Sequence, residues 1–127
     1  MKIFLLIIRI LMGALFLFSS VTFLFKLIVP PEMTGAMKVF NDGLNASVYL
    51  MPTVKVVELI CGLALLSNRF VPLALVLISP IIVNIFFVHI FLAPEGLPVA
   101  IFLIIANSLL AYQYKEIYSP LFKSKVD

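Results

Sequence analysis

The sequence is short of the side chains that build disulfides and metal centres. Its 127 residues include one cysteine, Cys61, and one histidine, His89. A lone cysteine can form neither an intramolecular disulfide nor a CxxC redox pair, so dithiol chemistry by this chain alone is excluded. One cysteine and one histidine are also too few for a Cys/His zinc site, and we expect no bound metal.

Charged residues are scarce as well. They make up 12% of the chain, against about 25% in ordinary soluble domains, while hydrophobic residues make up 64%. A soluble domain of this length exposes a large share of its surface and could not hide so much apolar material. The composition therefore predicts one membrane-embedded domain over residues 1–127, with the lipid bilayer as its surroundings.

The formal net charge of +3 does not indicate a nucleic-acid partner. Lys and Arg are scattered near the ends of apolar runs and form no basic stripe that could follow a phosphate backbone. An excess of basic residues is also what the cytoplasmic loops of membrane proteins produce. We therefore expect no nucleic-acid binding.

Four apolar runs are long enough to cross about 30 Å of hydrocarbon as helices that rise 1.5 Å per residue. They cover residues 3–29, 48–66, 70–92 and 97 to about 114, with a short turn at 93–96 before the last. The fold class predicted is an all-α membrane protein, a four-transmembrane-helix bundle with a long loop between helices 1 and 2. That loop covers residues 30–47, and its middle, 33–40, could form a short helix at the membrane interface.

Basic residues near the helix ends predict the orientation. With four crossings, the two termini and the turn after the second helix share one side of the membrane. That side carries Lys2, Arg69, Lys115, Lys123 and Lys125, whereas the other side carries only Lys26 and Lys38. The bias places both termini in the cytoplasm.

Several polar residues fall inside the expected spans: Arg9, Lys55, Glu58, Asn84 and Asn107. A charged side chain at the centre of a span costs at least about 2.5–3.5 kcal/mol, so such residues normally face the bundle interior and pair with one another. Helical spacing puts Lys55, Glu58 and Gly62 on one stripe and Arg9 and Gly13 on another. Small residues on these stripes let helix backbones approach closely.

Counting from the cytoplasmic ends puts Arg9, Glu58 and Asn107 within about one turn of each other in depth. We predict that Glu58 pairs with Arg9, with Asn107 hydrogen-bonded nearby, and that Lys55 competes for Glu58 on its own helix. Two interpretations stay open. The cluster is either structural, fixing helix order and register, or a functional site for a proton, a quinone headgroup or another polar ligand.

His89 follows Asn84 by five positions, about 140° around a helix, which predicts that the two do not share a face. It lies near the outer end of its span, where an imidazole can pack at the interface. Alternatively it accepts a proton or binds a ligand at the outer mouth, where Lys26 and the long loop could join it.

These residues also carry a family resemblance. The run Lys55-Val-Val-Glu58-Leu-Ile-Cys61-Gly62-Leu-Ala-Leu-Leu66 resembles the second-helix signature of the DoxX family of small bacterial membrane proteins. The pattern of Arg9, Gly13 and Lys26 is similar to the first helix of that family. Asn84 and His89 in the third helix, with the turn at residues 92–97, fit the family as well.

The resemblance implies a four-helix bundle in the bacterial inner membrane. It also implies a link to quinone-coupled oxidation of sulfur compounds or to thiol redox stress, in which Glu58, Lys26 and His89 would be the functional positions. Three hypotheses follow: an accessory membrane subunit that binds a quinone or other lipophilic ligand, a small transporter or channel component, or a non-catalytic scaffold. A partner protein or a homo-oligomer fits each of them. We expect no enzyme and no catalytic residues, because no nucleophile, base and orienting group share one face.

Overall fold

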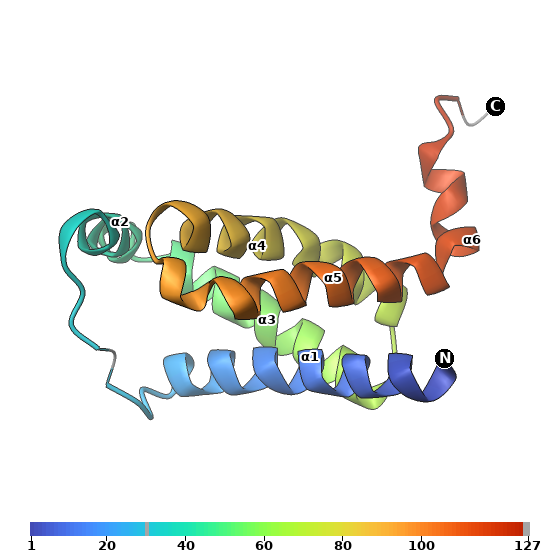
Figure 1. Cartoon of the computed structure of the whole chain (residues 1–127), viewed down its shortest axis with the longest axis horizontal. Helices are drawn as coiled ribbons and strands as arrows, with labels where there is room; N and C mark the ends of the chain where they lie inside the picture. Colours follow the sequence, from blue (N-terminus) through green and yellow to red (C-terminus); the bar gives the residue numbers. More distant parts are fainter. Residues whose placement is uncertain (30, 126–127) are drawn as a thin grey trace.

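The computed structural model describes residues 1–29 and 31–125. Four long helices dominate this part of the chain (Figure 1). They are α1 (Lys2–Leu24), α3 (Leu50–Ser67), α4 (Val71–Phe91) and α5 (Leu97–Gln113). All four, α5 together with the turn before it, are long and apolar enough to cross a membrane. The prediction of an all-α chain with four membrane-spanning helices is confirmed.

Shorter elements fill the connections. The helix α2 (Gly35–Ala46) precedes α3, and the 3-10 turn η1 (Pro94–Gly96) joins α4 to α5. After α5 the chain forms α6 (Lys115–Tyr118) and the 3-10 turn η2 (Ser119–Phe122), which turn away from the bundle axis (Figure 1).

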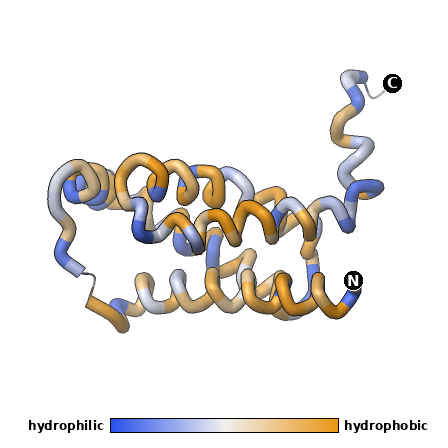
Figure 2. Tube along the Cα trace, viewed as in Figure 1, coloured by the Kyte–Doolittle hydropathy of each residue, from blue (hydrophilic) through white to orange (hydrophobic). Residues whose placement is uncertain are grey.

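The long helices close into a ring of neighbours. The helix α1 packs most extensively against α3, α3 packs against α4, α4 packs against α5, and α5 returns to α1. Both chain ends lie at one end of the bundle, and α2 lies across the opposite end (Figure 1). Figure 2 shows that the bundle is mostly hydrophobic along its length, with hydrophilic residues gathered at its two ends and in α2.

The core lies on the axis between the four helices. Its centre is formed by side chains that are at most 1% exposed, among them Met12, Leu65, Leu75, Ile78 and Leu110. The outer faces of the same helices are equally apolar, and large side chains such as Ile60, Leu73 and Ile105 are more than half exposed. Lipid accepts such a surface and water does not, because only water imposes a cost on exposed apolar area. The chain is therefore an integral membrane protein.

The predicted long loop at residues 30–47 is wrong, because most of that segment is the helix α2. The helix begins two residues later than the expected segment 33–40 and is longer. Met37, Phe40 and Leu44 follow one another at helical spacing and line a cavity beneath α2. On the opposite face, Lys38 Nζ pairs with Asp42 Oδ2 at 2.9 Å, where both side chains are well exposed. An amphipathic segment of this kind gains its stability from packing one face against its neighbours.

Candidate functional site

Lys55 and Glu58 form an ion pair on the inner face of α3. Lys55 Nζ lies 3.3 Å from Glu58 Oε2, and the two side chains are 14% and 4% exposed. The same ammonium donates a hydrogen bond to Ser19 Oγ of α1 at 2.8 Å. A spacing of three residues puts both charges on one face of the helix, so the pair forms without help from another helix. Ser19 then ties the pair to α1.

The predicted pairing of Glu58 with Arg9 is wrong. The Arg9 guanidinium instead donates to the main-chain carbonyl of Leu65, near the end of α3. The last carbonyls of a helix have no partner within it, and they carry the negative end of the helix dipole. An arginine on the neighbouring helix finds there an acceptor that is already unpaired, whereas Glu58 already has Lys55.

Asn107 also lies elsewhere than predicted. Its Nδ2 donates to Ser79 Oγ of α4 at 3.0 Å, and that hydroxyl donates to the Leu75 carbonyl at 2.6 Å. Within the described residues, Asn107 Oδ1 is buried without a partner. Asn107 thus joins α5 to α4 and is not part of the cluster around Glu58.

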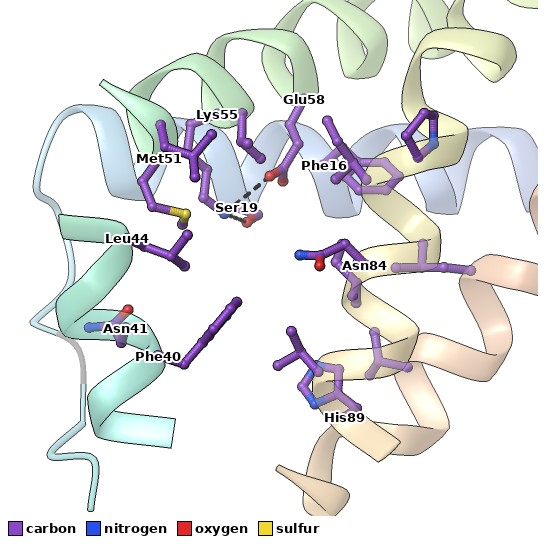
Figure 3. Close-up of a pocket in the computed structure, with 18 of the residues that line it drawn as sticks. Phe16, Ser19, Phe40, Asn41, Leu44, Met51, Lys55, Glu58, Asn84 and His89 are labelled. Carbon is purple, nitrogen blue, oxygen red and sulfur yellow. Dashed lines mark hydrogen bonds and ion pairs between the residues drawn. The ribbon is translucent and has the colours of Figure 1, made fainter. Parts of the chain in front are cut away.

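A cavity of about 790 Å³ lies between the long helices and α2. Its volume is within the range of about 300–1,000 Å³ usual for small-molecule sites. Most of its lining is apolar, including Phe16 of α1, Phe40 and Leu44 of α2, and Met51 of α3 (Figure 3). Such a lining suits a hydrophobic ligand.

Two sets of polar side chains interrupt the apolar lining from different sides (Figure 3). The Lys55–Glu58 pair and Ser19 face the cavity from α3 and α1, and Asn84 and His89 face it from α4. Asn84 and His89 both line this cavity, although they are five residues apart on α4. The cavity is wide enough to cover more than one side of α4, as Ile81 and Ile85 also line it.

His89 is held by the turn after α4. Its Nδ1 lies 2.9 Å from the Ala93 carbonyl oxygen, which can only accept, so Nδ1 carries a hydrogen. In the neutral ring, Nε2 is then an acceptor. Gly96 lies against the imidazole, and a Cβ atom at this glycine would overlap His89 Cε1. The turn therefore fixes both the tautomer of the ring and its position.

Asn84 presents its amide to the cavity in a different way. Its side chain is exposed, and it forms no hydrogen bond with any group in residues 1–29 or 31–125. An amide without a partner costs free energy in an apolar medium. Along a membrane-spanning helix, such a group is expected to meet a ligand, water or another protein.

Lys26 does not line the cavity. It follows α1 in a left-handed conformation with a φ of 54° and is exposed. Across the cavity from His89 lie side chains of α2, and Lys26 is not among the lining residues. Sequence reasoning missed Ser19 and the cavity-facing side chains of α2. The amphipathic spacing of Met37, Phe40 and Leu44 was the signal that could have revealed the latter.

No group of three or more His, Cys, Asp or Glu side chains that could hold a metal ion is found in the part of the chain that the structure describes. Cys61 is buried with a free thiol, whose Sγ lies 3.5 Å from the Ala74 carbonyl oxygen. It does not line the cavity.

Comparison with known proteins adds one finding. The sequence model of the DoxX family matches residues 4–90, which run from α1 through almost all of α4. The match includes Lys55, Glu58, Asn84 and His89, and it ends before α5 and Asn107. Neither a curated protein nor a solved structure matches the chain.

Proposed function

The chain belongs to the DoxX family of membrane proteins, and from this premise we propose that it is an accessory membrane subunit that binds a quinone or another lipophilic ligand. The ligand ring would lie in the cavity between α2 and the long helices, among the polar groups of α3 and α4. The apolar lining would hold the rest of the molecule.

One observation carries this proposal: the Asn84 amide faces an apolar cavity of about 790 Å³ and has no partner in the described residues. A polar residue with a purely structural role is expected to form hydrogen bonds within the protein, as Asn107 Nδ2 does with Ser79. A ligand with oxygen atoms on its ring would supply the missing hydrogen bonds. Its hydrophobic part would replace water against Phe40 and Met51.

The packing of the other half of the bundle favours a binding site that ends inside the bundle over a transport path. Arg9 lies near the end of the bundle that holds the termini, and Lys55 lies toward α2. Between these two positions the interior is filled by Met12, Phe16 and Leu65, which are at most 3% exposed. A channel lined by Arg9, Lys55 and Glu58 would need these side chains to move apart.

We propose an orientation in the inner membrane with both termini in the cytoplasm. The basic residues that flank the spans are more numerous at the end where the termini lie. The helix α2 and the cavity would then belong to the outer half of the membrane. A membrane-impermeant maleimide tests this in intact cells with Asn45→Cys in α2 and Ser124→Cys in the tail, since Cys61 is buried. Labelling of Asn45→Cys alone supports the proposal, and labelling of Ser124→Cys alone reverses it.

The binding proposal is tested with two matched variants, Asn84→Leu and Asn107→Leu. Each removes one amide from the membrane interior, but only Asn84 lines the cavity. We expect Asn84→Leu to weaken binding of a decyl-benzoquinone by roughly fivefold or more, the effect of one or two lost hydrogen bonds, and Asn107→Leu to leave it unchanged. Native mass spectrometry from mild detergent reports both the bound ligand and the oligomeric state. Equal affinities in both variants and the parent chain would contradict this site.

A further inference from the structure

The imidazole of His89 lines the cavity with one ring nitrogen committed and one free. Nδ1 donates to the Ala93 carbonyl, which is at 2.9 Å. Nε2 forms no hydrogen bond with any residue that the structure describes, so the neutral ring offers an acceptor. A ligand group that reaches this nitrogen must therefore donate a hydrogen bond. A carbonyl oxygen cannot do so.

The opposite wall offers a ligand both a donor and an acceptor. Lys55 uses two of its three ammonium hydrogens on Glu58 and Ser19, which leaves one for a ligand. The Glu58 carboxylate accepts through two oxygens and has about four lone-pair sites, so it retains capacity for a further donor. A hydroxyl group can donate to the carboxylate and accept from the ammonium, whereas a carbonyl or an ether can only accept.

The opposite charges of Lys55 and Glu58 also limit which headgroup a ligand in the cavity can carry. Lys55 and Glu58 are 3.3 Å apart and cancel each other. An anionic headgroup that approached the Lys55 ammonium would also come beside the Glu58 carboxylate. A cationic headgroup that approached the carboxylate would also come beside the ammonium. In the low dielectric of the membrane interior such like-charge contacts are strongly unfavourable. The cavity therefore suits an uncharged headgroup.

Resting on the proposed function, we infer that the cavity selects an uncharged ring that carries hydroxyl groups over a ring that carries only carbonyl or ether oxygens. Of a quinone and its hydroquinone, the hydroquinone is the form held more tightly. The quinone would leave His89 Nε2 without a partner, and at the opposite wall it could accept from Lys55 but could not donate to Glu58. A buried acceptor without a partner loses binding free energy that an additional apolar contact does not restore.

The test uses three probes with the same decyl tail: a hydroquinone, the corresponding quinone, and the dimethyl ether of the hydroquinone. Binding to the full chain in lipid nanodiscs is measured by calorimetry without oxygen. We expect the hydroquinone to bind about tenfold more tightly than either of the other two. Equal or tighter binding of the quinone and the ether overturns this inference but leaves the proposed function standing. Absence of binding by all three probes overturns both.

Two variants test whether His89 is responsible for the preference for the hydroquinone. His89→Ala removes the acceptor, and Gly96→Ala leaves the histidine but pushes its ring aside, because the new Cβ would overlap Cε1. In both variants we expect hydroquinone and ether to bind with nearly equal affinity, because only the hydroquinone loses a hydrogen bond. Val83→Ala, an apolar change on the same helix but outside the cavity lining, serves as the control and should keep the tenfold preference. A preference that persists in both His89→Ala and Gly96→Ala overturns the role of His89. If His89→Ala does not fold, the comparison of Gly96→Ala with the parent chain still tests the role of His89.

Discussion

Gly13 of α1 and Gly62 of α3 meet backbone to backbone where the two helices cross. A Cβ atom at Gly62 would lie 3.0 Å from the Gly13 carbonyl oxygen and 3.0 Å from the Leu17 amide nitrogen. A Cβ at Gly13 would lie 3.2 Å from the Gly62 carbonyl oxygen. These neighbours are main-chain atoms, which cannot rotate away as a side chain can. The contact between α1 and α3 therefore depends on both glycines.

Gly62→Ala is expected to lower the free energy of unfolding by about 1–3 kcal/mol, the usual cost of overpacking a close contact. Unfolding of the detergent-solubilised protein in increasing dodecyl sulfate measures the effect. Gly43→Ala in α2 is the matched control, because nothing lies within 4 Å of a Cβ at that position. It should be neutral or stabilise the helix by about 0.5–1 kcal/mol. Similar destabilisation by the two changes would contradict the close contact.

Removal of one partner of the buried ion pair should be more costly than removal of both. Glu58→Ala leaves the Lys55 ammonium, 14% exposed, without its carboxylate, and we expect a loss of about 3–5 kcal/mol. The double variant Lys55→Met, Glu58→Leu should lose clearly less, since no charge remains. The comparison is made by the same unfolding titration.

The pair between Lys38 and Asp42 provides the control for that experiment. Its side chains are 60% and 59% exposed, so Asp42→Asn should change stability by less than about 1 kcal/mol. A double variant as unstable as Glu58→Ala alone would mean that Lys55 and Glu58 are not coupled.

The hydrogen bond from Asn107 to Ser79 joins α5 to α4 and should contribute modestly to stability. Ser79→Ala removes the acceptor of Asn107 Nδ2, whose Oδ1 already has no partner in the described residues. We expect a loss of about 0.6–1.7 kcal/mol, typical of hydrogen bonds between membrane helices. Adding Asn107→Leu to this variant should recover part of the loss, because the unpaired amide is then gone. No recovery would mean that the amide finds another partner.

Tyr118 fixes α6 to the start of α4 and makes this contact dependent on pH. Its hydroxyl donates to the Pro72 carbonyl at 2.6 Å. Burial, and to a smaller extent Tyr114, raise the pKa of Tyr118 above its usual value of 10.0. A raised pKa means that the protonated form stabilises the folded contact. That stabilisation is fully present below pH 10 and is lost as the pH rises through the higher value.

Hydrogen exchange of the α6 amides, corrected for intrinsic rates, measures this dependence between pH 8 and pH 11. Protection should fall at high pH in the parent chain. In Tyr118→Phe it should be low throughout and should not change with pH. Tyr112→Phe, which removes a more exposed hydroxyl, is the control and should behave like the parent chain. A fall in protection that persists in Tyr118→Phe would assign the titration to another group.

The sequence by itself determined that this is a membrane protein with four crossings. Hydrocarbon thickness sets the length of a span, and apolar residues mark it locally, so the four runs could be located without knowledge of their packing. The glycines at 13 and 62 could also be assigned to helix contacts, because helical spacing puts them beside polar residues on inward faces. For the connection before α3, the expected long loop was wrong, because packing of its apolar face stabilises the helix α2.

Only the tertiary structure decided which polar groups meet. Counting residues gives the depth of a side chain in the membrane but not the rotation of its helix about its own axis. Arg9 and Lys55 were therefore both possible partners for Glu58, and the packing gave Arg9 the Leu65 carbonyl instead. The cavity also depends on these rotations, because its walls come from five helices. The sequence of a single helix does not determine how that helix is rotated relative to the others.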